Sequence, residues 1–310
     1  EQIVTSKNIV QHLKAIKNET EIGHIKNAMR KDGVALTKLF MWLEKMLEER
    51  EIPEVEVAEK LANFRAQQEH YYGESFDAIV GYNGNGAIVH YRAEAATCAN
   101  IKKEGILLLD SGGQYFDGTT DITRTIALSE PTAEQKRNYT SVLKGHIALD
   151  TAKFPHGTTG PQLDTLARMY LWQDCLNYGH GTGHGVGFFL NVHEPPQGFA
   201  TNPTTSRGRT AIVPGMFTSN EPGFYKKEEY GIRIENLVIC REGEKNDFGQ
   251  FYQFENLTMF PIETILIDKK LLTERETKWL NDYHQEVFEK LSPLLNEEET
   301  AWMKAKCAAI

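Results

Sequence analysis

The 310-residue sequence lacks several features that would assign a protein quickly to a class. It contains no uninterrupted run of eighteen apolar residues, so we expect no helix to cross a membrane. It also has no basic excess, because 34 Lys and Arg stand against 43 Asp and Glu, for a formal charge of −9. That balance argues against a general binder of the nucleic-acid phosphate backbone. We therefore expect neither nucleic acid nor a membrane as a partner.

Cysteine is scarce and dispersed. The four residues Cys98, Cys175, Cys240 and Cys307 form no C-x-x-C pair, which favours reduced thiols in a cytoplasmic protein over a disulfide framework or a zinc knuckle. The chain also begins at Glu1, without an initiator methionine or a signal-like apolar stretch. We therefore expect it to be part of a longer protein, in which the missing N-terminus would hold any targeting signal.

The most informative stretch is Leu107-Leu108-Leu109-Asp110, which Asp121 follows eleven residues after Asp110. Three consecutive leucines predict a buried strand, and a carboxylate at its end needs a cation or a set of hydrogen bonds. Asp117-Gly118 predicts a turn, and alternation beyond Asp121 predicts a second strand. Such a hairpin can bring Asp110 and Asp121 side by side. Because two close carboxylates repel, divalent metal ions between them are the simplest explanation.

Helical periodicity alternates with short strand patterns along the chain, which indicates the α/β (α+β) class. The predicted helices cover 21–50 with a break near Gly33, 53 to before Gly73, 133–153, 162–176, a segment after Thr273 and a segment from Glu297. The predicted strands cover 76–80, 87–91, 107–109, 216–220, 231–240, 257–260 and 262–267. Residues 195–215 are rich in Pro, Gly and Thr and predict a surface flap. Each half of the chain offers helices and then a strand pair that carries two carboxylates.

Four histidines lie in notable contexts: His90, His180, His184 and His193. The glycines interleaved from His180 to His184 argue against a helical zinc motif, and the glutamate of the zinc-protease motif is absent. We therefore expect at most one of the last three histidines to bind metal, while the others line a cavity. Taken alone, His90 is more typical of a hydrogen-bonded structural histidine than of a catalytic one.

Two glutamates follow or lie within predicted apolar strands, Glu221 and Glu235, and each alone is typical of a solvated strand residue. Together with Asp110, Asp121 and His184 they offer four carboxylates and one imidazole. That set suits Mn²⁺, Co²⁺ or Zn²⁺ and carries enough negative charge to neutralise two dications. Two ions roughly 3.5–4 Å apart can share a water that loses a proton near neutral pH, which supplies a hydroxide to attack a carbonyl.

In order and spacing, these five residues resemble the metal ligands of the metallopeptidases with the pita-bread fold, which include methionine aminopeptidase, prolidase and aminopeptidase P. The resemblance is strongest to aminopeptidase P and extends over nearly the whole chain. The segment Trp279-Leu-Asn-Asp-Tyr-His284 resembles the C-terminal extension of the long, three-domain form. The motifs that carry the resemblance are Asp121-Ile-Thr-Arg-Thr, His180-Gly-Thr-Gly-His184-Gly-Val-Gly, Leu190-Asn-Val-His193-Glu, Asn220-Glu221-Pro-Gly-Phe-Tyr and Gly231-Ile-Arg233-Ile-Glu235-Asn.

The resemblance implies a division of labour among the five candidate ligands. Asp110 would chelate one metal ion, and Asp121 and Glu235 would bridge the pair. His184 and Glu221 would hold the second ion. Two divalent ions are implied, with Mn²⁺ expected first and Co²⁺ or Zn²⁺ as alternatives.

Further roles follow from the same resemblance. His90 and His193 would contact the scissile carbonyl and stabilise its developing negative charge, and His180 would shape the pocket for proline. Arg233 would support the bridging carboxylates by hydrogen bonding. Glu221 would carry a proton to the leaving proline nitrogen.

The fold implied is a curved mixed or antiparallel sheet, with helices packed outside and two halves related by a pseudo-twofold axis. We expect a catalytic domain over 1–270 and a C-terminal helical extension over 271–310, packed on that domain and contributing to a homodimer. The long form of the family carries two further domains before the catalytic one, to which this chain has no counterpart.

The expected function is removal of the N-terminal residue from peptides with proline in the second position. The nearest rival is a prolidase, which a carboxylate-recognising arginine near the cleft would favour. A binding module of the same fold is a second rival, and it would be expected to lack at least one of the five ligands. In a third reading the carboxylates are structural and bind no metal.

Overall fold

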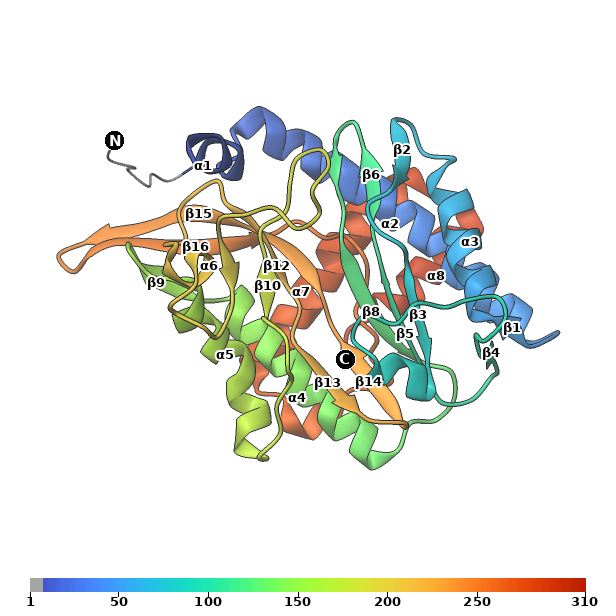
Figure 1. The fold of residues 1–310 in the computed structure, drawn as a ribbon. Coiled ribbons are helices and arrows are strands. Elements are labelled where there is room, and N and C mark those ends of the chain that lie inside the picture. Colours follow the sequence, from blue (N-terminus) through green and yellow to red (C-terminus); the bar gives the residue numbers. More distant parts are fainter. Residues whose placement is uncertain (1–7) are drawn as a thin grey trace.

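A computed structural model of the chain describes residues 8–310 (Figure 1). None of the helices in these residues is both long and apolar enough to cross a membrane. The helices are α1 (Ile9–Ala15), α2 (Glu19–Leu47), α3 (Glu54–Arg65), α4 (Ala133–Asp150), α5 (Gly160–Gln173), α6 (Ser206–Arg209), α7 (Glu274–Leu291) and α8 (Glu297–Lys306), with short 3-10 turns η1 (Asn83–Ala87), η2 (Lys269–Leu271) and η3 (Ser292–Leu294).

All strand pairs recorded in residues 8–310 are antiparallel. Two sheets matter most for the site, one with the order β3-β5-β8 and the other with the order β12-β15-β16-β9. The strands of these two sheets are β3 (Ile79–Tyr82), β5 (Ile106–Ser111), β8 (Ile122–Ala127), β9 (Lys153–Pro155), β12 (Phe217–Asn220), β15 (Asn236–Asn246) and β16 (Gly249–Asn256).

Smaller two- and three-stranded sheets complete the structure, with the orders β2-β6-β7, β13-β14, β10-β11 and β1-β4. Their strands are β1 (Ile52–Pro53), β2 (Tyr71–Glu74), β4 (Asn100–Ile101), β6 (Gly113–Tyr115), β7 (Gly118–Thr119), β10 (Gly183–His184), β11 (Gly198–Phe199), β13 (Gly223–Lys226) and β14 (Tyr230–Arg233).

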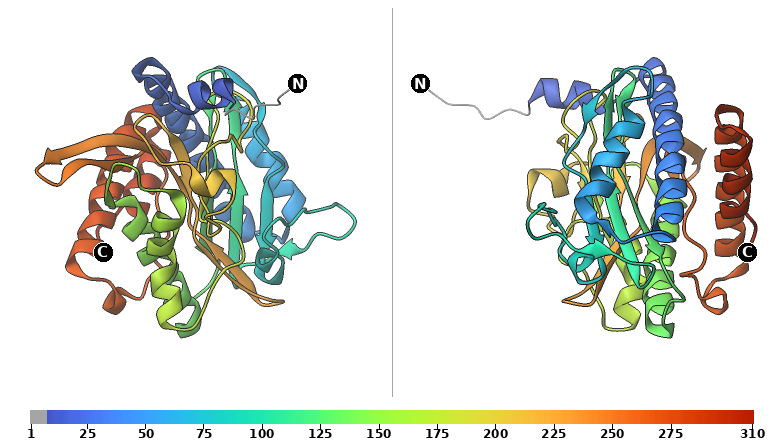
Figure 2. Two further views of the ribbon diagram at one scale, coloured as in Figure 1. Left: turned by 60° about the vertical axis from the view of Figure 1, so that its left-hand side comes forward. Right: turned by 90° about the vertical axis from the view of Figure 1, so that its right-hand side faces the viewer.

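The helices and strands form layers, which the right-hand view of Figure 2 shows edge-on. α2 lies against one side of the strands, and the C-terminal helix α8 lies outside α2. The irregular segments lie on the opposite side. The main apolar core fills the space between α2, α7 and the strands, and a second core lies under α5 and the β15–β16 hairpin.

Helix α2 is continuous, so the predicted break near Gly33 is wrong. It begins with a capping box in which Asn18 and Glu21 satisfy each other's backbone amides. A Cβ at Gly33 would lie 2.3 Å from the carbonyl oxygen of Met259, so the glycine serves close packing rather than a helix end. Sequence periodicity cannot distinguish these two uses of a glycine.

The predicted capping boxes at Thr132 and Thr273 are confirmed as the starts of α4 and α7. In α7, Leu280, Val287 and Leu291 are buried in the main core, and burial of each such side chain contributes about 1.5–3 kcal/mol before ordering costs. The C-terminal helices therefore pack on α2 and not on each other alone.

Several predicted strands are wrong in position. Residues 87–91 form no strand, because η1 ends at Ala87 and irregular backbone follows to residue 99. Residues 257–260 and 262–267 are also irregular, whereas the last long strand is β16, which the sequence reading missed.

The predicted strand 231–240 is interrupted at one point that matters. β14 ends at Arg233 and β15 begins at Asn236, so Glu235 lies between two strands that pair with different partners. The amide of Glu235 donates instead to the carbonyl of Thr123 in β8, at 3.1 Å. The break places Glu235 where the two main sheets approach each other.

The Pro-, Gly- and Thr-rich stretch 195–215 is only partly a surface flap. Phe199 and Ile212 are fully buried in the second core, so part of this stretch is core. Residues 201–206, up to the start of the short helix α6, remain exposed. Composition predicted the irregular backbone correctly but not its burial.

Candidate metal centre

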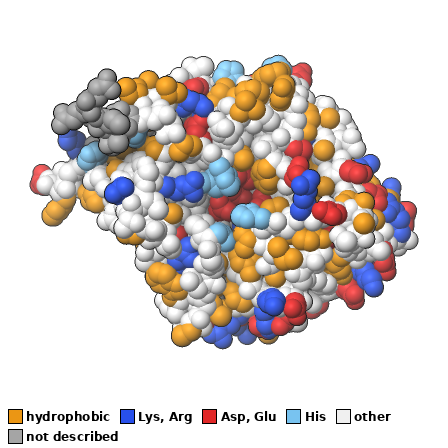
Figure 3. All heavy atoms as spheres, in the orientation of Figure 1, with side chains coloured by type: hydrophobic (Ala, Val, Ile, Leu, Met, Phe, Trp, Pro, Cys, Tyr) orange, Lys and Arg blue, Asp and Glu red, His pale blue; other side chains and the backbone are white. Residues whose placement is uncertain are grey.

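A cavity of about 580 Å³ is lined by residues of β3, β5, β10 and β14 and of the loops around them. Figure 3 shows acidic atoms at the bottom of this hollow, with histidines around it. The cavity is lined by all nine residues that the sequence singled out: His90, Asp110, Asp121, His180, His184, His193, Glu221, Arg233 and Glu235. Residues more than a hundred positions apart thus meet in one place.

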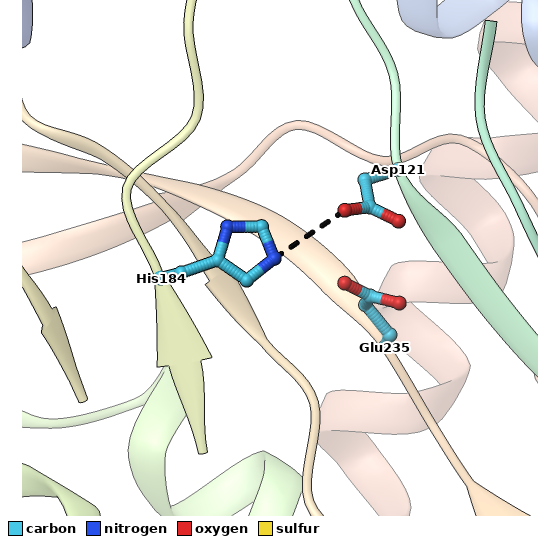
Figure 4. Close-up of side chains that lie close together, drawn as sticks. All are labelled: Asp121, His184 and Glu235. Atoms are coloured by element: carbon cyan, nitrogen blue, oxygen red, sulfur yellow. Dashed lines mark ion pairs between the residues drawn. The ribbon is translucent and has the colours of Figure 1, made fainter. Parts of the chain in front are cut away.

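Three side chains form the tightest group, Asp121, His184 and Glu235 (Figure 4). One ligand atom of each lies within 4.8 Å of the others, and all three residues are buried. The Nε2 atom of His184 lies 3.5 Å from Oδ2 of Asp121 and 3.4 Å from Oε1 of Glu221. This spacing leaves room for a cation between the ligand atoms rather than direct hydrogen bonds.

Local structure aims each of these side chains at the cavity. Asp121 immediately precedes β8, and His184 ends the short strand β10. The Oγ–H of Thr123 donates to Oε2 of Glu235 at 2.7 Å, which ties the interrupted strand to β8. The amide of His184 donates to Oγ of Ser219, at 2.9 Å, and so connects β10 to β12.

Asp110 and Glu221 extend the acidic group. Asp110 lies on β5 opposite Thr123 of β8, so the predicted hairpin does bring the two aspartates to the same site. Its Oδ2 accepts from Nη2 of Arg233 at 2.6 Å, while its buried Oδ1 has no partner in the described part of the chain. An unpartnered buried carboxylate oxygen in this position fits a metal ligand.

The charges of the group are mutually unfavourable without cations. Burial, and then the charges of Asp110 and Glu221, raises the pKa of Asp121 well above its usual value. Burial and the charge of Asp121 do the same to the pKa of Glu235, and burial also raises the pKa of Glu221. Arg233 offers only one positive charge to four carboxylates. Divalent cations would allow all four to ionise together.

The orientation of His184 also suits a metal. Its Nδ1 lies 3.0 Å from the carbonyl oxygen of Gly185, which makes Nδ1 the protonated nitrogen. The lone pair of Nε2 then faces the carboxylates, as in a ligand imidazole held by a backbone acceptor. His180 and His193 are outside the tight group, in keeping with the expectation of a single histidine ligand there.

The remaining histidines lie around the acidic group. The ring of His193 packs against that of His184, with centroids 3.8 Å apart. His180 contacts the hydroxyl of Tyr225 through Nε2 at 2.8 Å, and burial lowers the pKa of His180 to about 4. His180 is therefore neutral at neutral pH. His90 is exposed on the irregular segment that follows η1.

Sequence reasoning missed Tyr225, which contacts cavity residues from outside the lining, and the lining residues Arg92 and Arg207. Tyr225 accepts from Nη1 of Arg233 at 2.7 Å and so links that arginine to His180. Its position in the Glu221-Pro-Gly-Phe-Tyr motif was a usable signal. Arg92 and Arg207 also line the cavity. No signal in the sequence marked them, because Arg92 lies in an irregular exposed stretch and Arg207 in the four-residue helix α6.

The chain is similar in sequence to known proteins over nearly its whole length. Residues 23–242 match the model of metallopeptidase family M24, and residues 250–310 match the C-terminal region of that peptidase family. A probable Xaa-Pro aminopeptidase P of Coprinopsis cinerea is 50% identical over 307 residues, which cover 97% of this chain and 49% of that protein. Aminopeptidase P2 of Arabidopsis thaliana is 48% identical, over 93% of this chain and 41% of that one. The chain spans about half the length of the curated relatives it matches.

Solved structures give the same result. The X-prolyl aminopeptidase of Caenorhabditis elegans, described as a cytosolic enzyme with a di-nuclear active site, superposes with a TM-score of 0.92 at 40% identity, covering 98% of this chain and 50% of that one. A Xaa-Pro dipeptidase of Bacillus anthracis superposes with a TM-score of 0.69 at 30% identity, over 84% and 67% of the two chains. The predicted fold class, α/β with antiparallel sheets in the pita-bread fold, is confirmed.

Proposed function

The chain belongs to metallopeptidase family M24, and from this premise we propose that it removes the N-terminal residue from peptides with proline in the second position. The observation that carries the proposal is the buried group of four carboxylates and one imidazole at the bottom of a cavity ringed by histidines. The names of the relatives, Xaa-Pro aminopeptidase P and X-prolyl aminopeptidase, support the choice of substrate.

We propose that the site holds two divalent ions, with Mn²⁺ as the first candidate and Co²⁺ or Zn²⁺ as alternatives. Asp121 and Glu235 would bridge the pair, Asp110 would hold one ion, and His184 with Glu221 would hold the other. The unpartnered Oδ1 of Asp110 and the free Nε2 of His184 support this assignment. When bound, the ions would supply Lewis acidity and a water that is acidic enough to ionise near neutral pH.

The side chains around the ions would do the rest. His90 and His193 would donate hydrogen bonds to the scissile carbonyl as negative charge develops there. Glu221, whose Oε1 accepts from Ser219 Oγ at 2.9 Å, would hold a proton and pass it to the departing proline nitrogen.

Arg233 would position these groups rather than contact substrate. It donates to Asp110 at 2.6 Å and to Tyr225 at 2.7 Å, and Tyr225 contacts His180. A single guanidinium therefore orients a candidate ligand and, through Tyr225, the proposed wall of the proline pocket. Lysine could not replace it, because an ammonium lacks the planar fork that spans both partners.

One observation favours the rival function, a prolidase that cleaves Xaa-Pro dipeptides. Arg92 and Arg207 line the cavity, and either could bind the free carboxylate of a dipeptide. The extended resemblance through the C-terminal region, which matches over 250–310, favours the aminopeptidase. No observation favours a binding module, because all five candidate ligands are present and gathered at the cavity.

Parallel assays of a tripeptide and a dipeptide separate these functions. The chain is stripped of metal, reloaded with Mn²⁺ and given Ala-Pro-Ala in one reaction and Ala-Pro in another. Release of alanine from the tripeptide, with little from the dipeptide, supports the aminopeptidase. Release chiefly from the dipeptide supports the prolidase, and no release from either with Mn²⁺, Co²⁺ or Zn²⁺ overturns the enzymatic proposal.

We further propose that residues 1–270 act as the catalytic domain and 271–310 as its helical extension, in a cytoplasmic homodimer. Residues 1–7 of that range lie outside the described structure. The exposed side chains of Leu271 and Leu294 in the extension support a protein contact there. Light scattering of the chain as it elutes from a sizing column tests the dimer, and a monomer at every concentration contradicts it.

A further inference from the structure

The segment 83–99 lines the cavity without regular structure of its own beyond η1. It contributes His90, Tyr91 and Arg92 to the lining. Its apolar residue Ile88 is 54% exposed, so burial of apolar surface does little to hold it. Polar contacts must therefore determine the path of its backbone.

Those contacts converge on Glu54, the first residue of α3, which lies outside the cavity and is fully buried. Its Oε1 accepts from the amide of Tyr82 at 2.8 Å, and its Oε2 accepts from the amide of Ala99 at 2.9 Å. The hydroxyl of Tyr91 donates to Oε2 at 2.7 Å. The side-chain amide of Asn85 lies 3.0 and 3.1 Å from the two oxygens. One carboxylate thus contacts both ends and the middle of the segment.

Glu54 also grips the far end of the segment through its backbone, since its amide donates to the carbonyl of Ala99 at 3.1 Å. No Lys, Arg or His side chain within residues 8–310 forms an ion pair with it. The charge is instead stabilised by neutral donors and by the N-terminus of α3. A carboxylate buried without a cation is costly, and an organising role explains its presence.

We propose that Glu54 is a positioning residue that sets the place of His90 at the cavity by fixing Tyr91. The neighbour of Tyr91 in sequence is His90, so a fixed tyrosine side chain fixes the backbone from which His90 projects. The kinetic part of this inference rests on the proposed function, in which His90 contacts the scissile carbonyl. The structural part, that Glu54 orders 83–99, does not.

Glu54→Gln is the sharpest single change. It keeps the shape of the side chain, but its NH₂ group must replace either Oε1 or Oε2. In one orientation the NH₂ group faces the amide of Tyr82, and in the other it faces the amide of Ala99. Because both groups are donors, no hydrogen bond can form there. The matched control is Glu56→Gln on the same helix, where the carboxylate pairs with Arg50 near the surface.

The expected result has three parts, measured on the full chain loaded with Mn²⁺. Glu54→Gln exchanges amide hydrogens faster over 83–99, whereas calorimetric binding of Mn²⁺ is unchanged. Its kcat/KM for Ala-Pro-Ala falls about 10- to 100-fold, as for a misplaced catalytic group. In a His90→Gln background the same change has little further effect, because both act through one group. Glu56→Gln matches the wild-type chain throughout.

Several outcomes overturn the proposal. One is amide exchange over 83–99 in Glu54→Gln that is no faster than in Glu56→Gln. Another is a double variant in which the losses of kcat/KM from Glu54→Gln and His90→Gln multiply fully. If Glu54→Gln does not fold, Tyr91→Phe removes the hydroxyl that contacts Glu54 and Asn85 and leaves the other contacts of Glu54, and it must raise exchange around residue 91 and lower kcat/KM. If the wild-type chain cleaves no Xaa-Pro peptide, the proposed function fails, while the exchange data still decide whether Glu54 orders the segment.

Discussion

The bottom and the edge of the cavity are built differently. The carboxylate floor, defined as Asp110, Asp121, His184, Glu221 and Glu235, lies on or beside strands. The rim, defined as His90, Arg92, His193 and Arg207, lies on irregular segments and on the four-residue helix α6. Four of the five floor residues are buried, whereas three of the four rim residues are exposed.

This difference separates two tasks. Buried carboxylates must be held in one geometry and compensated by cations, and strand ends joined by backbone hydrogen bonds provide that rigidity. A rim that meets peptides of varied sequence gains from segments free of a strand ladder. The floor should therefore control ion binding, and the rim should control what the bound ions act on.

The largest effect is expected from Asp121→Asn in the floor. An amide cannot ionise, so binding of Mn²⁺ should be lost and peptide cleavage should fall to that of the metal-free chain. The metal-free variant should be at least as stable as the wild type, because a buried, repelled carboxyl group has been removed. Calorimetry and thermal unfolding with and without Mn²⁺ measure both effects. The control is Asp282→Asn, at an exposed position on α7. Tight Mn²⁺ binding by Asp121→Asn would contradict the assigned floor.

His193→Gln tests the rim. Removal of one donor to a developing oxyanion costs roughly 10²–10³-fold in kcat. Binding of Mn²⁺ should stay near that of the wild type, although the ring of His193 packs on that of His184. A fall in Mn²⁺ affinity as large as the fall in kcat would show that the rim and the floor are one unit.

Arg124→Lys tests whether a buried arginine that contacts the backbone of the floor is needed for metal binding. The buried guanidinium donates to the carbonyls of Glu235 at 2.7 Å and Thr123 at 3.0 Å, and to the hydroxyl of Tyr283 of α7 at 3.0 Å. One ammonium cannot span these partners, so we expect Mn²⁺ affinity to fall about 10- to 100-fold. Tyr283→Phe, which removes only the link to α7, should cost less. If Arg124→Lys bound Mn²⁺ with wild-type affinity, the metal centre would not depend on contacts with the C-terminal region.

The stability of the metal-free protein should depend on pH because of the floor carboxylates. The raised pKa of Asp121 means that the folded chain keeps a proton which the unfolded chain loses above about pH 4. Stability of the metal-free protein should therefore fall as pH rises from that value, by at most about 1.4 kcal/mol per pH unit for one proton. Asp121→Asn lacks this contribution, so its advantage over the wild type should grow with pH. Urea unfolding in the presence of a chelator, at several pH values, measures the difference in free energy of unfolding between Asp121→Asn and the wild type. A difference that does not change with pH would show that the raised pKa of Asp121 is not its cause.

The smallest effect is expected far from both regions. Lys278 pairs with Asp282 one turn along α7, and both side chains are exposed. Lys278→Ala should change the free energy of unfolding by no more than about 0.5 kcal/mol, since exposed ion pairs contribute little. Chemical unfolding measures this change, and a large loss would show that α7 depends on surface charge rather than on its buried face.

Patterns local in sequence were predictable. The leucine strand before Asp110 and the capping box at Thr273 appear where they were expected, and the turn predicted at Asp117-Gly118 lies one residue earlier, at Phe116-Asp117. Each depends on neighbours within a few residues, so the signal lies within a short window. The break between Arg233 and Glu235 was not predictable, because it is imposed by β8 and β13, more than a hundred and about ten residues away respectively.

The sequence by itself determined which residues carry charge into the interior, and hence that a cation site was needed. Only the tertiary structure decided how that site is supported: Arg124 ties the floor to α7, and Glu54 gathers an irregular segment. The physical reason is that burial cost belongs to each residue and can be read along the chain. The partners that offset it come from distant segments, and only folding brings them together.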